Sequence, residues 1–440
     1  MVLIFCCRFY KIRINFPAFN KARIMSIVTA SSTEDLLGEK VEQATATKKS
    51  KIFDFKMWNK RHVAFKVLYL GWDYSGLALQ DTTTETIEAK LFDALLKTKL
   101  IEDPSQSNYS RCGRTDKGVS AFGQVITLDV RTALLEGEGV IVPEGSKAIE
   151  RKGDKIIELP YLNMLNRVLP KDIKLSAWAP VPPQFSARFN TMHRIYKYYF
   201  PMGSMDIELM REGARKFIGH HDFRNFCKYD TNDLATQSIK FDRTILDIKI
   251  EPLDQNSSVV SSHQLYACTV TGLAFLRHQI RCMMSLLFLV GHKLEQPSII
   301  DYMLDISQCP GKPQYGMAAD FPLVLHDCVF QDIEWQYLDY SYVNVISELQ
   351  KAWTYHMTQA MIVKSMIDQL EGIDTSSFSP SLLPLPTNYL FPVLKTDHKL
   401  GKSYKPIRNR PTSGSYEERC ENYKAAKKRK LEDGSSSENT

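Results

Sequence analysis

The sequence predicts an α+β fold, because stretches with strand periodicity and stretches with helix periodicity alternate along the chain. Residues 63–70 and 124–130 are rich in β-branched and apolar residues and are bounded by glycine, which predicts two strands. Between them, apolar residues recur at helical spacing over 87–95, after Thr84 and Thr86, either of which is a suitable N-cap. An order of strand, helix, loop and strand is typical of the α+β class. With 440 residues, the chain has room for two packed domains and tails.

The same two periodicities continue to the end of the chain. Further strands are predicted by alternation or by β-branched content over residues 173–178, 194–200, 246–250, 265–270 and 321–330. Helices are predicted over residues 207–217, 282–290 and 346–370, and a helix over 163–170 is implied only by the resemblance described below. The apolar run at 282–290 is far shorter than the roughly 20 residues that cross a bilayer, so it is expected to be a core helix and no membrane contact is expected.

Composition narrows the class of partner and argues against a metal centre. The net charge is only +6, so nucleic-acid binding would require basic residues to cluster on one face. The nine cysteines form no Cys-x-x-Cys pair, and the ten histidines show no zinc-ligand spacing. The pair His220 and His221 has no partner ligands at useful spacing, and residues 221–223 are expected to form a turn. We therefore expect no metal and no cofactor.

The most informative stretch is the polar loop at residues 111–118, which precedes the strand at 124–130. Two glycines five residues apart indicate a tight loop around one acid, Asp116. Arg111, Arg114 and Lys117 surround that acid in sequence and are expected to lower its pKa. An ionised carboxylate amid cations suits a nucleophile or a base that meets an anionic substrate. The alternative interpretation is a surface turn with a local ion pair.

Residues 111–120 resemble the signature loop of the TruA family of tRNA pseudouridine synthases. Blocks similar to other family motifs follow in the family's order at residues 160–170, 185–189, 194–198, 221–226 and 275–281. The resemblance covers roughly residues 62–330. The block from Phe275 and the segment from Pro406 are most similar to the eukaryotic branch that acts in the anticodon arm.

The resemblance implies a role for each matched residue. Asp116 matches the family's indispensable Asp and is expected to be the catalytic nucleophile or to stabilise charge at the sugar; attack on sugar or base stays open. Tyr196 is expected to stack on the base, Arg281 to pair with Asp116, and Arg114 to fill the space that a flipped base leaves. Further RNA or substrate contacts are expected from Arg111, Lys117, Arg188, Arg277, His278 and Leu323. Two positions depart from the family pattern, with Leu77 in place of an aromatic residue and Pro322 in place of glycine.

The implied activity is the isomerisation of uridine to pseudouridine in the anticodon stem-loop of tRNA, at positions 38 and 39, without cofactor or metal. The implied fold is a pair of mixed-sheet halves around a central basic cleft, with a helical extension, and the implied assembly is a homodimer. A tRNA-binding or chaperone protein without catalysis is the alternative. A hydrolytic glycosidase is disfavoured, because that chemistry needs two carboxylates and only Asp116 is in view.

The chain divides into five parts by composition. They are a basic amino-terminal extension (1–60), a half that carries the Asp loop (61–182), a second catalytic half (183–335), an amphipathic helix expected to pack on the core (336–372), and a basic tail rich in Pro and Ser (373–440).

Signals for two compartments lie at opposite ends of the chain. The run at residues 424–430 is typical of a nuclear-localisation signal or a phosphate-binding patch, with a solvated tail as the alternative. Residues 1–33 have the basic, acid-free composition of a transit peptide, unless translation begins at Met25. We expect a protein of nucleus and cytoplasm, and the amino-terminal pattern leaves a mitochondrial pool open.

Overall fold

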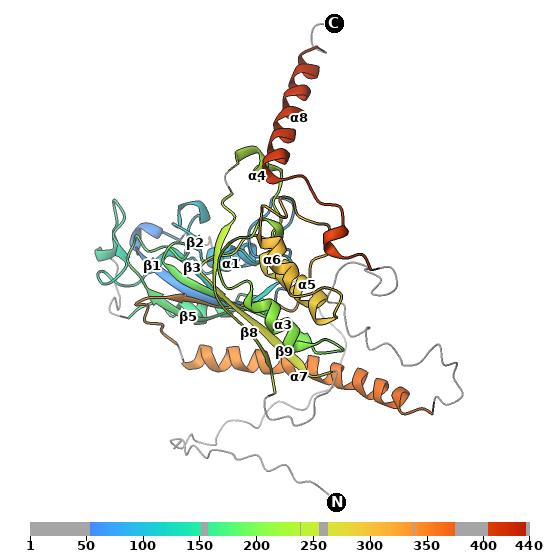
Figure 1. The fold of residues 1–440 in the computed structure, drawn as a ribbon. Coiled ribbons are helices and arrows are strands. Elements are labelled where there is room, and N and C mark those ends of the chain that lie inside the picture. Colours follow the sequence, from blue (N-terminus) through green and yellow to red (C-terminus); the bar gives the residue numbers. More distant parts are fainter. Residues whose placement is uncertain are drawn as a thin grey trace, which may run out of the picture. The chain divides into compact units, whose positions relative to one another are not determined.

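The computed structural model describes residues 53–150, 157–237, 239–254, 263–337, 339–374 and 404–436 (Figure 1). The chain from Phe53 onward forms one compact unit. Most of the predicted basic extension at residues 1–60 therefore lies outside the described residues.

One large mixed sheet forms the centre of the molecule. Its ten strands are β1 (Asn59–Tyr69), β2 (Ser110–Arg111), β3 (Ser120–Thr132), β4 (Val140–Ile141), β5 (Ile173–Pro180), β6 (Thr191–Pro201), β7 (Gly219–Asp222), β8 (Asp242–Pro252), β9 (Leu265–Gly272) and β10 (Leu323–Phe330). The order across the sheet is β4-β1-β3-β10-β6-β9-β8-β7, with β2 added on β3 and β5 on β1. Every pairing is antiparallel except that of β3 with β10. The predicted α+β class is confirmed.

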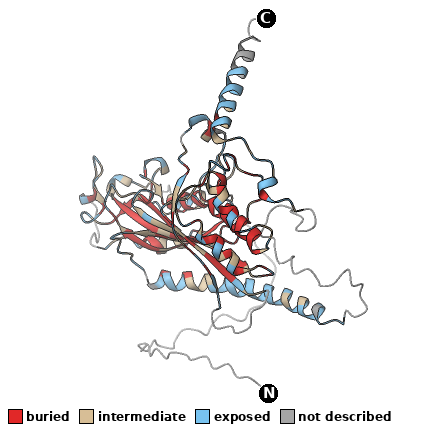
Figure 2. Cartoon of the chain, viewed as in Figure 1, coloured by how far each residue is buried: buried red, intermediate tan, exposed pale blue. Residues whose placement is uncertain are grey.

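Helices of very different burial accompany the sheet (Figure 2). The α-helices are α1 (Ile87–Lys97), α2 (Tyr161–Asn166), α3 (Ile207–Arg215), α4 (Thr231–Thr236), α5 (Gln279–Gly291), α6 (Ser298–Leu304), α7 (Asp339–Glu371) and α8 (Tyr416–Ser436). Short 3-10 turns occupy Phe55–Met57, Pro104–Gln106, Ala148–Glu150, Arg224–Phe226 and Ile407–Asn409. No helix in the described ranges has both the length and the apolar character needed to cross a bilayer.

Two helices show how the local sequence determines these elements. The hydroxyl of Thr86 caps α1 by accepting the backbone N–H of Ala89 at 3.3 Å, and the apolar positions at helical spacing are buried. Every residue of α5 is buried, as its continuous apolar run predicts. Helix α3 packs beside it, and Gly213 of α3 lies close to the side chains of Leu287 and Ile300. The helix predicted over 163–170 begins and ends earlier, as α2.

The two sequence halves share one sheet, which differs from the two separate sheets that were expected. Strands β1 to β5 belong to the first half and β6 to β10 to the second. They are joined where β3 and β10 run parallel, with Ser120 opposite Val324 and Ala121 opposite Leu325. This junction directly follows the loop that carries Asp116, so both halves contribute to the surroundings of that residue.

Helix α7 packs on the core through its first half, where Trp72 still meets the ring of His356 at 5.1 Å. Ser341 and Val345 are buried, and the helix contacts α2 and β5. Beyond them the apolar side chains point into solvent, with Trp353 64% exposed and Leu370 65% exposed (Figure 2). The apolar side chains of the carboxy-terminal half of α7 are therefore exposed within the described part of the chain.

Part of the predicted basic tail is folded. Ile407 is fully buried, and the hydroxyl of Tyr404 donates to Glu295 at 2.7 Å. Residues 404–415 lead into α8, which contacts α4. The expected linker around 375–403 lies outside the described residues, but a disordered tail does not describe residues 404–436, because their apolar and aromatic side chains find partners on the core.

The expected turn at residues 221–223 is also corrected. His220 and His221 belong to the short strand β7, where they lie opposite Thr244 and Arg243 of β8. The backbone of this segment extends the edge of the sheet, and a bend begins only at Phe223, which is buried.

Candidate active site

The loop between β2 and β3 presents Asp116 and is shaped by close backbone packing. Gly118 has a φ of +78°, and its N–H donates to the carbonyl of Tyr74 at 3.2 Å. The N–H of Val119 donates back to the carbonyl of Asp116, also at 3.2 Å. A Cβ on Gly71 would lie 1.9 Å from the carbonyl oxygen of Val119. The chain at Gly71 therefore has to lack a side chain for the loop to adopt this position.

Side chains from β1 and β3 also form hydrogen bonds with this loop. The hydroxyl groups of Tyr69 and Thr115 lie 2.7 Å apart, directly beside Asp116. The amide of Gln124 donates to the carbonyl of Gly113 at 2.8 Å. These contacts from β1 and β3 fix the backbone before the acid, and the hydrogen bonds of Gly118 and Val119 fix it after the acid, which is what a precisely placed catalytic group requires.

The carboxylate of Asp116 is partly buried, and burial dominates its titration. Its side chain is 26% exposed, and Oδ2 lies 3.5 Å from Nε2 of His278. Burial raises the pKa of Asp116, while the nearby charges of Arg281 and Arg277 oppose this rise and Asp320 adds to it. The prediction that surrounding cations lower this pKa is wrong, because the loss of hydration outweighs them.

The three cations adjacent in sequence point elsewhere. Arg111 forms an ion pair with Glu88, a buried acid on α1. Arg114 and Lys117 are exposed, as expected for side chains that meet RNA, and no ion pair joins either of them to Asp116 in the described part of the chain. The predicted crowding of these cations around Asp116 is therefore not observed.

Arg281 lies behind the loop and has a different partner from the one expected. Its Nη2 is 3.7 Å from Asp320, and its Nε donates to the carbonyl of Ala318 at 2.8 Å. The side chain of Asp320 in turn lies against Gly118, where a Cβ would approach it to 2.9 Å. Arg281 thus stabilises the loop through Asp320 and acts on Asp116 through its charge, without the direct ion pair that was predicted.

His278 is the side chain closest to the acid, a contact that the sequence did not indicate. Its backbone is left-handed, with a φ of +62°, which is unusual for a residue other than glycine. Burial and the charges of Arg281 and Arg277 lower the pKa of His278 to about 3, so the ring is neutral at physiological pH. Its Nδ1 is buried without a hydrogen-bond partner among the described residues. The ring therefore contacts Asp116 as a neutral group, and the positive charge that acts on the acid comes from Arg281 and Arg277.

Tyr196 occupies the middle of β6, two strands from the start of β3. It lies opposite Leu325 of β10, which lies opposite Ala121. Adjacent strands are about 4.8 Å apart, so Tyr196 is roughly 10 Å from Ala121 across the sheet. Its ring meets Phe275 edge-on at 5.1 Å, and burial raises its pKa well above the usual value. Within the described chain no hydrogen bond joins Tyr196 to Asp116.

The remaining predicted contacts lie around this centre. Leu323 is buried opposite Tyr198, at the start of β10. Arg188 and Arg277 are exposed; the first lies over the ring of Phe189 at 5.4 Å, and the second is 3.4 Å from Asp230. The predicted residues thus form an inner group around Asp116 and an outer group of exposed cations.

Two residues that hold the loop were missed in the sequence. Arg194 donates to the carbonyls of Cys112, Arg188 and Leu273, and so ties the loop to β6 and to the segment before α5. Glu88 is buried and, besides its ion pair with Arg111, accepts from the hydroxyl of Tyr109 at 2.8 Å. An acid on the apolar face of a predicted helix was the available signal for Glu88, since its burial requires a partner.

A separate apolar cavity of about 500 Å³ lies on the other side of the sheet. It is lined by residues such as Tyr199 and Leu265, and by Leu349 of α7. Successive residues of a strand face opposite sides of the sheet. Tyr196 and Tyr199 are three residues apart in β6, so their side chains lie on opposite faces. None of the predicted site residues lines this cavity.

Comparison of the sequence with known proteins assigns the chain to a protein family. A family model described as tRNA pseudouridine synthase matches residues 214–331. A tRNA pseudouridine(38/39) synthase from Homo sapiens is 42% identical over 400 residues, which is 86% of this chain and 80% of that protein. The chain belongs to the TruA family of tRNA pseudouridine synthases. The resemblance inferred from the loop at 111–120 is confirmed.

Other members of the TruA family show how far the similarity extends. The tRNA pseudouridine(38/39) synthase of Saccharomyces cerevisiae is 40% identical over 79% of this chain and 76% of its own length. The tRNA pseudouridine synthase A of Methanosarcina acetivorans is 27% identical over 69% of this chain and 98% of its own length. The crystal structure of a Cbf5-Nop10-Gar1 complex matches 52% of this chain and 45% of its own, with 12% identity and a TM-score of 0.23.

Proposed function

We propose that this protein isomerises uridine to pseudouridine at positions 38 and 39 of tRNA. The names of the human and yeast relatives support the reaction and the positions. The observation that carries the proposal for this chain is the placement of Asp116. A partly buried carboxylate stands on a packed loop at the junction of two half-sheets, and the charges of Arg281 and Arg277 act on it.

The reaction breaks the bond between the sugar C1′ and the base nitrogen, turns the base, and forms a bond from C1′ to a base carbon. The carbon that gains the sugar loses a proton, and the nitrogen that lost the sugar gains one, so atoms balance. We assign the role of nucleophile to Asp116, because a carboxylate held by its neighbours can form and release a covalent bond. Its raised pKa reflects incomplete hydration, so little water has to be displaced when substrate arrives.

The surrounding residues receive matching roles. A stacked uridine has to leave the helix at a cost of roughly a few kcal/mol. Arg114 is exposed two residues from Asp116 and is placed to occupy the vacated space. The buried ring of Tyr196 offers a face for the base. Arg281 supplies positive charge and supports the loop through Asp320, while Arg188 and Arg277 are available to contact phosphates.

Replacement of the acid tests this assignment against a tRNA-binding protein without catalysis. Wild-type protein should form pseudouridine in tRNA, and Asp116→Ala should lower the rate by at least about 1,000-fold while tRNA affinity stays within about twofold. The exposed acid Asp93 on α1 provides a control, since Asp93→Ala should retain full turnover. Pseudouridine is measured in tRNA after incubation, and binding by filter retention.

Three results would contradict the assignment in different ways. Binding without product from the wild-type protein would indicate a binding protein or chaperone. Release of free uracil would indicate hydrolysis. Normal product from Asp116→Ala would remove this residue from the chemistry.

We also propose that the active form is a homodimer and that the protein resides in nucleus and cytoplasm. The dimer is supported by the exposed apolar residues on the second half of α7, including Trp353 and Leu370. The nuclear assignment is supported by the basic run at 424–430.

A further inference from the structure

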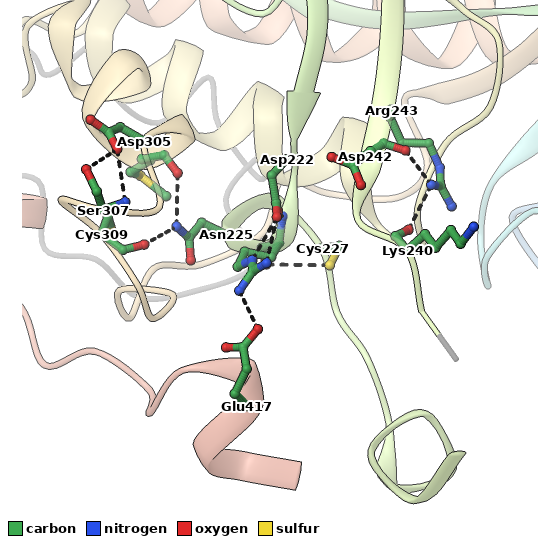
Figure 3. Close-up of polar contacts among 12 residues, drawn as sticks. Asp222, Asn225, Cys227, Lys240, Asp242, Arg243, Asp305, Ser307, Cys309 and Glu417 are labelled. Atoms are coloured by element: carbon green, nitrogen blue, oxygen red, sulfur yellow. Dashed lines mark hydrogen bonds and ion pairs between the residues drawn. The ribbon is translucent and has the colours of Figure 1, made fainter. Parts of the chain in front are cut away.

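Helix α8 is attached to the core by specific contacts at its first turns. Arg224, which follows β7, pairs with Asp222 at 2.8 Å and with Glu417 of α8 at 2.9 Å. Figure 3 labels the two acids, Asp222 and Glu417. The ring of Tyr416 lies 4.8 Å from that of Phe241 and 5.3 Å from that of Tyr229, in edge-on contacts. These charged and aromatic contacts fix the direction in which the helix leaves the core.

The second half of α8 carries the basic run away from the core (Figure 1). Lys424 donates a hydrogen bond of 3.1 Å to Gln237, which directly follows α4. Lys427, Lys428 and Arg429 follow, and all three are exposed. A helix rises 1.5 Å per residue, so Arg429 lies about 15 Å beyond Arg419 along the axis.

A short series of contacts connects the base of α8 to the candidate active site. Asp116 is 3.5 Å from His278, and the neighbouring Arg277 accepts, through its carbonyl, the N–H of the residue before Tyr229 at 3.1 Å. Arg419 of α8 donates to the hydroxyl of Tyr229 at 3.0 Å and lies 4.7 Å over its ring. The first turns of α8 therefore contact the exposed rim of the site and are connected to Asp116 through the short series of contacts just described.

The rim between these points is itself positive. Arg277 and Lys228 are exposed there. Together with Arg281 and Lys312 they lie close enough to His278 to depress its pKa by their charge. The basic residues of α8 thus add to the cations Arg277 and Lys228 that lie beside the site.

We propose that α8 is a rigid arm that binds the phosphate backbone of the tRNA substrate outside the catalytic centre, through Lys427, Lys428 and Arg429. This inference rests on the proposed function for its substrate and deepens it. RNA phosphates are the ligand that charge complementarity favours, since lysine and arginine on an exposed helix bind phosphate without reading sequence. A helix attached to the core loses little conformational entropy on binding, in contrast to a free basic tail.

The test compares tRNA binding by wild-type protein and by the triple variant K427A/K428A/R429A over a range of salt concentrations. Each lost phosphate contact should reduce the slope of log affinity against log salt by about 0.7–0.9, so three contacts give a reduction of about 2–3. At physiological salt the affinity should fall roughly tenfold or more, with the loss in turnover appearing in KM for tRNA rather than in kcat. The triple variant K249A/K293A/K351A removes three exposed charges from β8, the end of α5 and α7, and should bind tRNA nearly as the wild type does.

Two outcomes would overturn the inference. The first is an unchanged salt slope and an unchanged tRNA affinity in the α8 variant. If that variant also failed to accumulate in the nucleus, the basic run would be assigned to binding a transport receptor. The second is an equal loss in the control variant, which would reduce the effect to net charge. Because the measurement is of binding, it remains informative if wild-type protein makes no pseudouridine, and the Asp116→Ala test decides that question separately.

Discussion

The pKa of Asp116 illustrates how the residue proposed as nucleophile can be unfavourable for stability. Burial raises its pKa above that of an exposed Asp, so between the unfolded and folded pKa values the folded state binds more protons. Stability then falls as pH rises through this interval, and the loss persists at higher pH. At neutral pH the folded protein thus holds an acid whose charge is poorly solvated.

Asp116→Asn should therefore stabilise the protein at neutral pH. The amide has the shape of the acid but carries no charge that burial would penalise, and the expected increase in Tm is roughly 1–4 °C. The difference should diminish as the pH is lowered through the raised pKa of the wild-type acid, which then takes up its proton. Thermal unfolding of both proteins between pH 4 and 8 measures this, and a lower Tm for the variant at pH 7 would refute the account. Asp93→Asn on the surface of α1 should show no such pattern.

At this scale the motifs predicted candidate site residues but not the partners of their side chains. Asp116, Tyr196 and Arg281 were indicated by motif, and the structure places them in or near one region. Their pairings depend on residues distant in the chain. Glu88 captures Arg111, and Asp320 takes the position beside Arg281 that Asp116 was expected to fill. Spacing along the chain does not reveal which of several acids pairs with a given arginine in the folded protein.

At the scale of elements, the active-site loop depends on a close approach to the end of β1. Gly71 follows this strand, and its N–H donates to the hydroxyl of Ser120 at 2.9 Å. Any side chain at Gly71 would meet the backbone of Val119, which cannot rotate away. The loop would have to move as a unit.

Gly71→Ala should destabilise the protein by about 1–3 kcal/mol and lower turnover by displacing Asp116. Gly113→Ala is a matched control in the same loop, because the nearest atom to its added Cβ is a flexible side chain at 4.0 Å. The control should unfold close to the wild-type temperature. Calorimetry measures the stability and a pseudouridine assay the turnover. Equal unfolding temperatures and equal turnover in the two variants would show that the close backbone approach at Gly71 does not determine the loop position.

Elements with strong periodicity were predictable and those fixed by tertiary contacts were not. The strands that became β1, β3, β6, β8 and β9 and the apolar helix α5 were identified from pattern alone. The strand β7 was not, because its histidines have no strand pattern and are extended only by pairing with β8. Helix α8 was missed because its polar sequence is typical of a disordered tail, and Tyr416 anchors it through rings that lie far away in sequence.

For the whole molecule, the exposed half of α7 is expected to mediate self-association. Its apolar residues have no partner surface within the described chain that would bury them, and a second copy would provide one. The double variant V363D/L370D should shift the molar mass in solution from about twice 50.4 kDa to about 50.4 kDa. Light scattering after gel filtration measures this mass. The exposed polar substitution K351D on the same helix is a control, and a monomeric wild-type protein would exclude the dimer.

The parallel pairing of β3 with β10 has a consequence for biosynthesis. Ser120 and Val324 are neighbours in space but about 200 residues apart in the chain. During translation, the amino-terminal strands can assemble among themselves long before β10 leaves the ribosome, and the edge of β3 is then open to other nascent chains. The active site is therefore complete only when β10, the last strand, pairs with β3. A polypeptide truncated before β10 would carry the Asp116 loop without the strand that packs beside it.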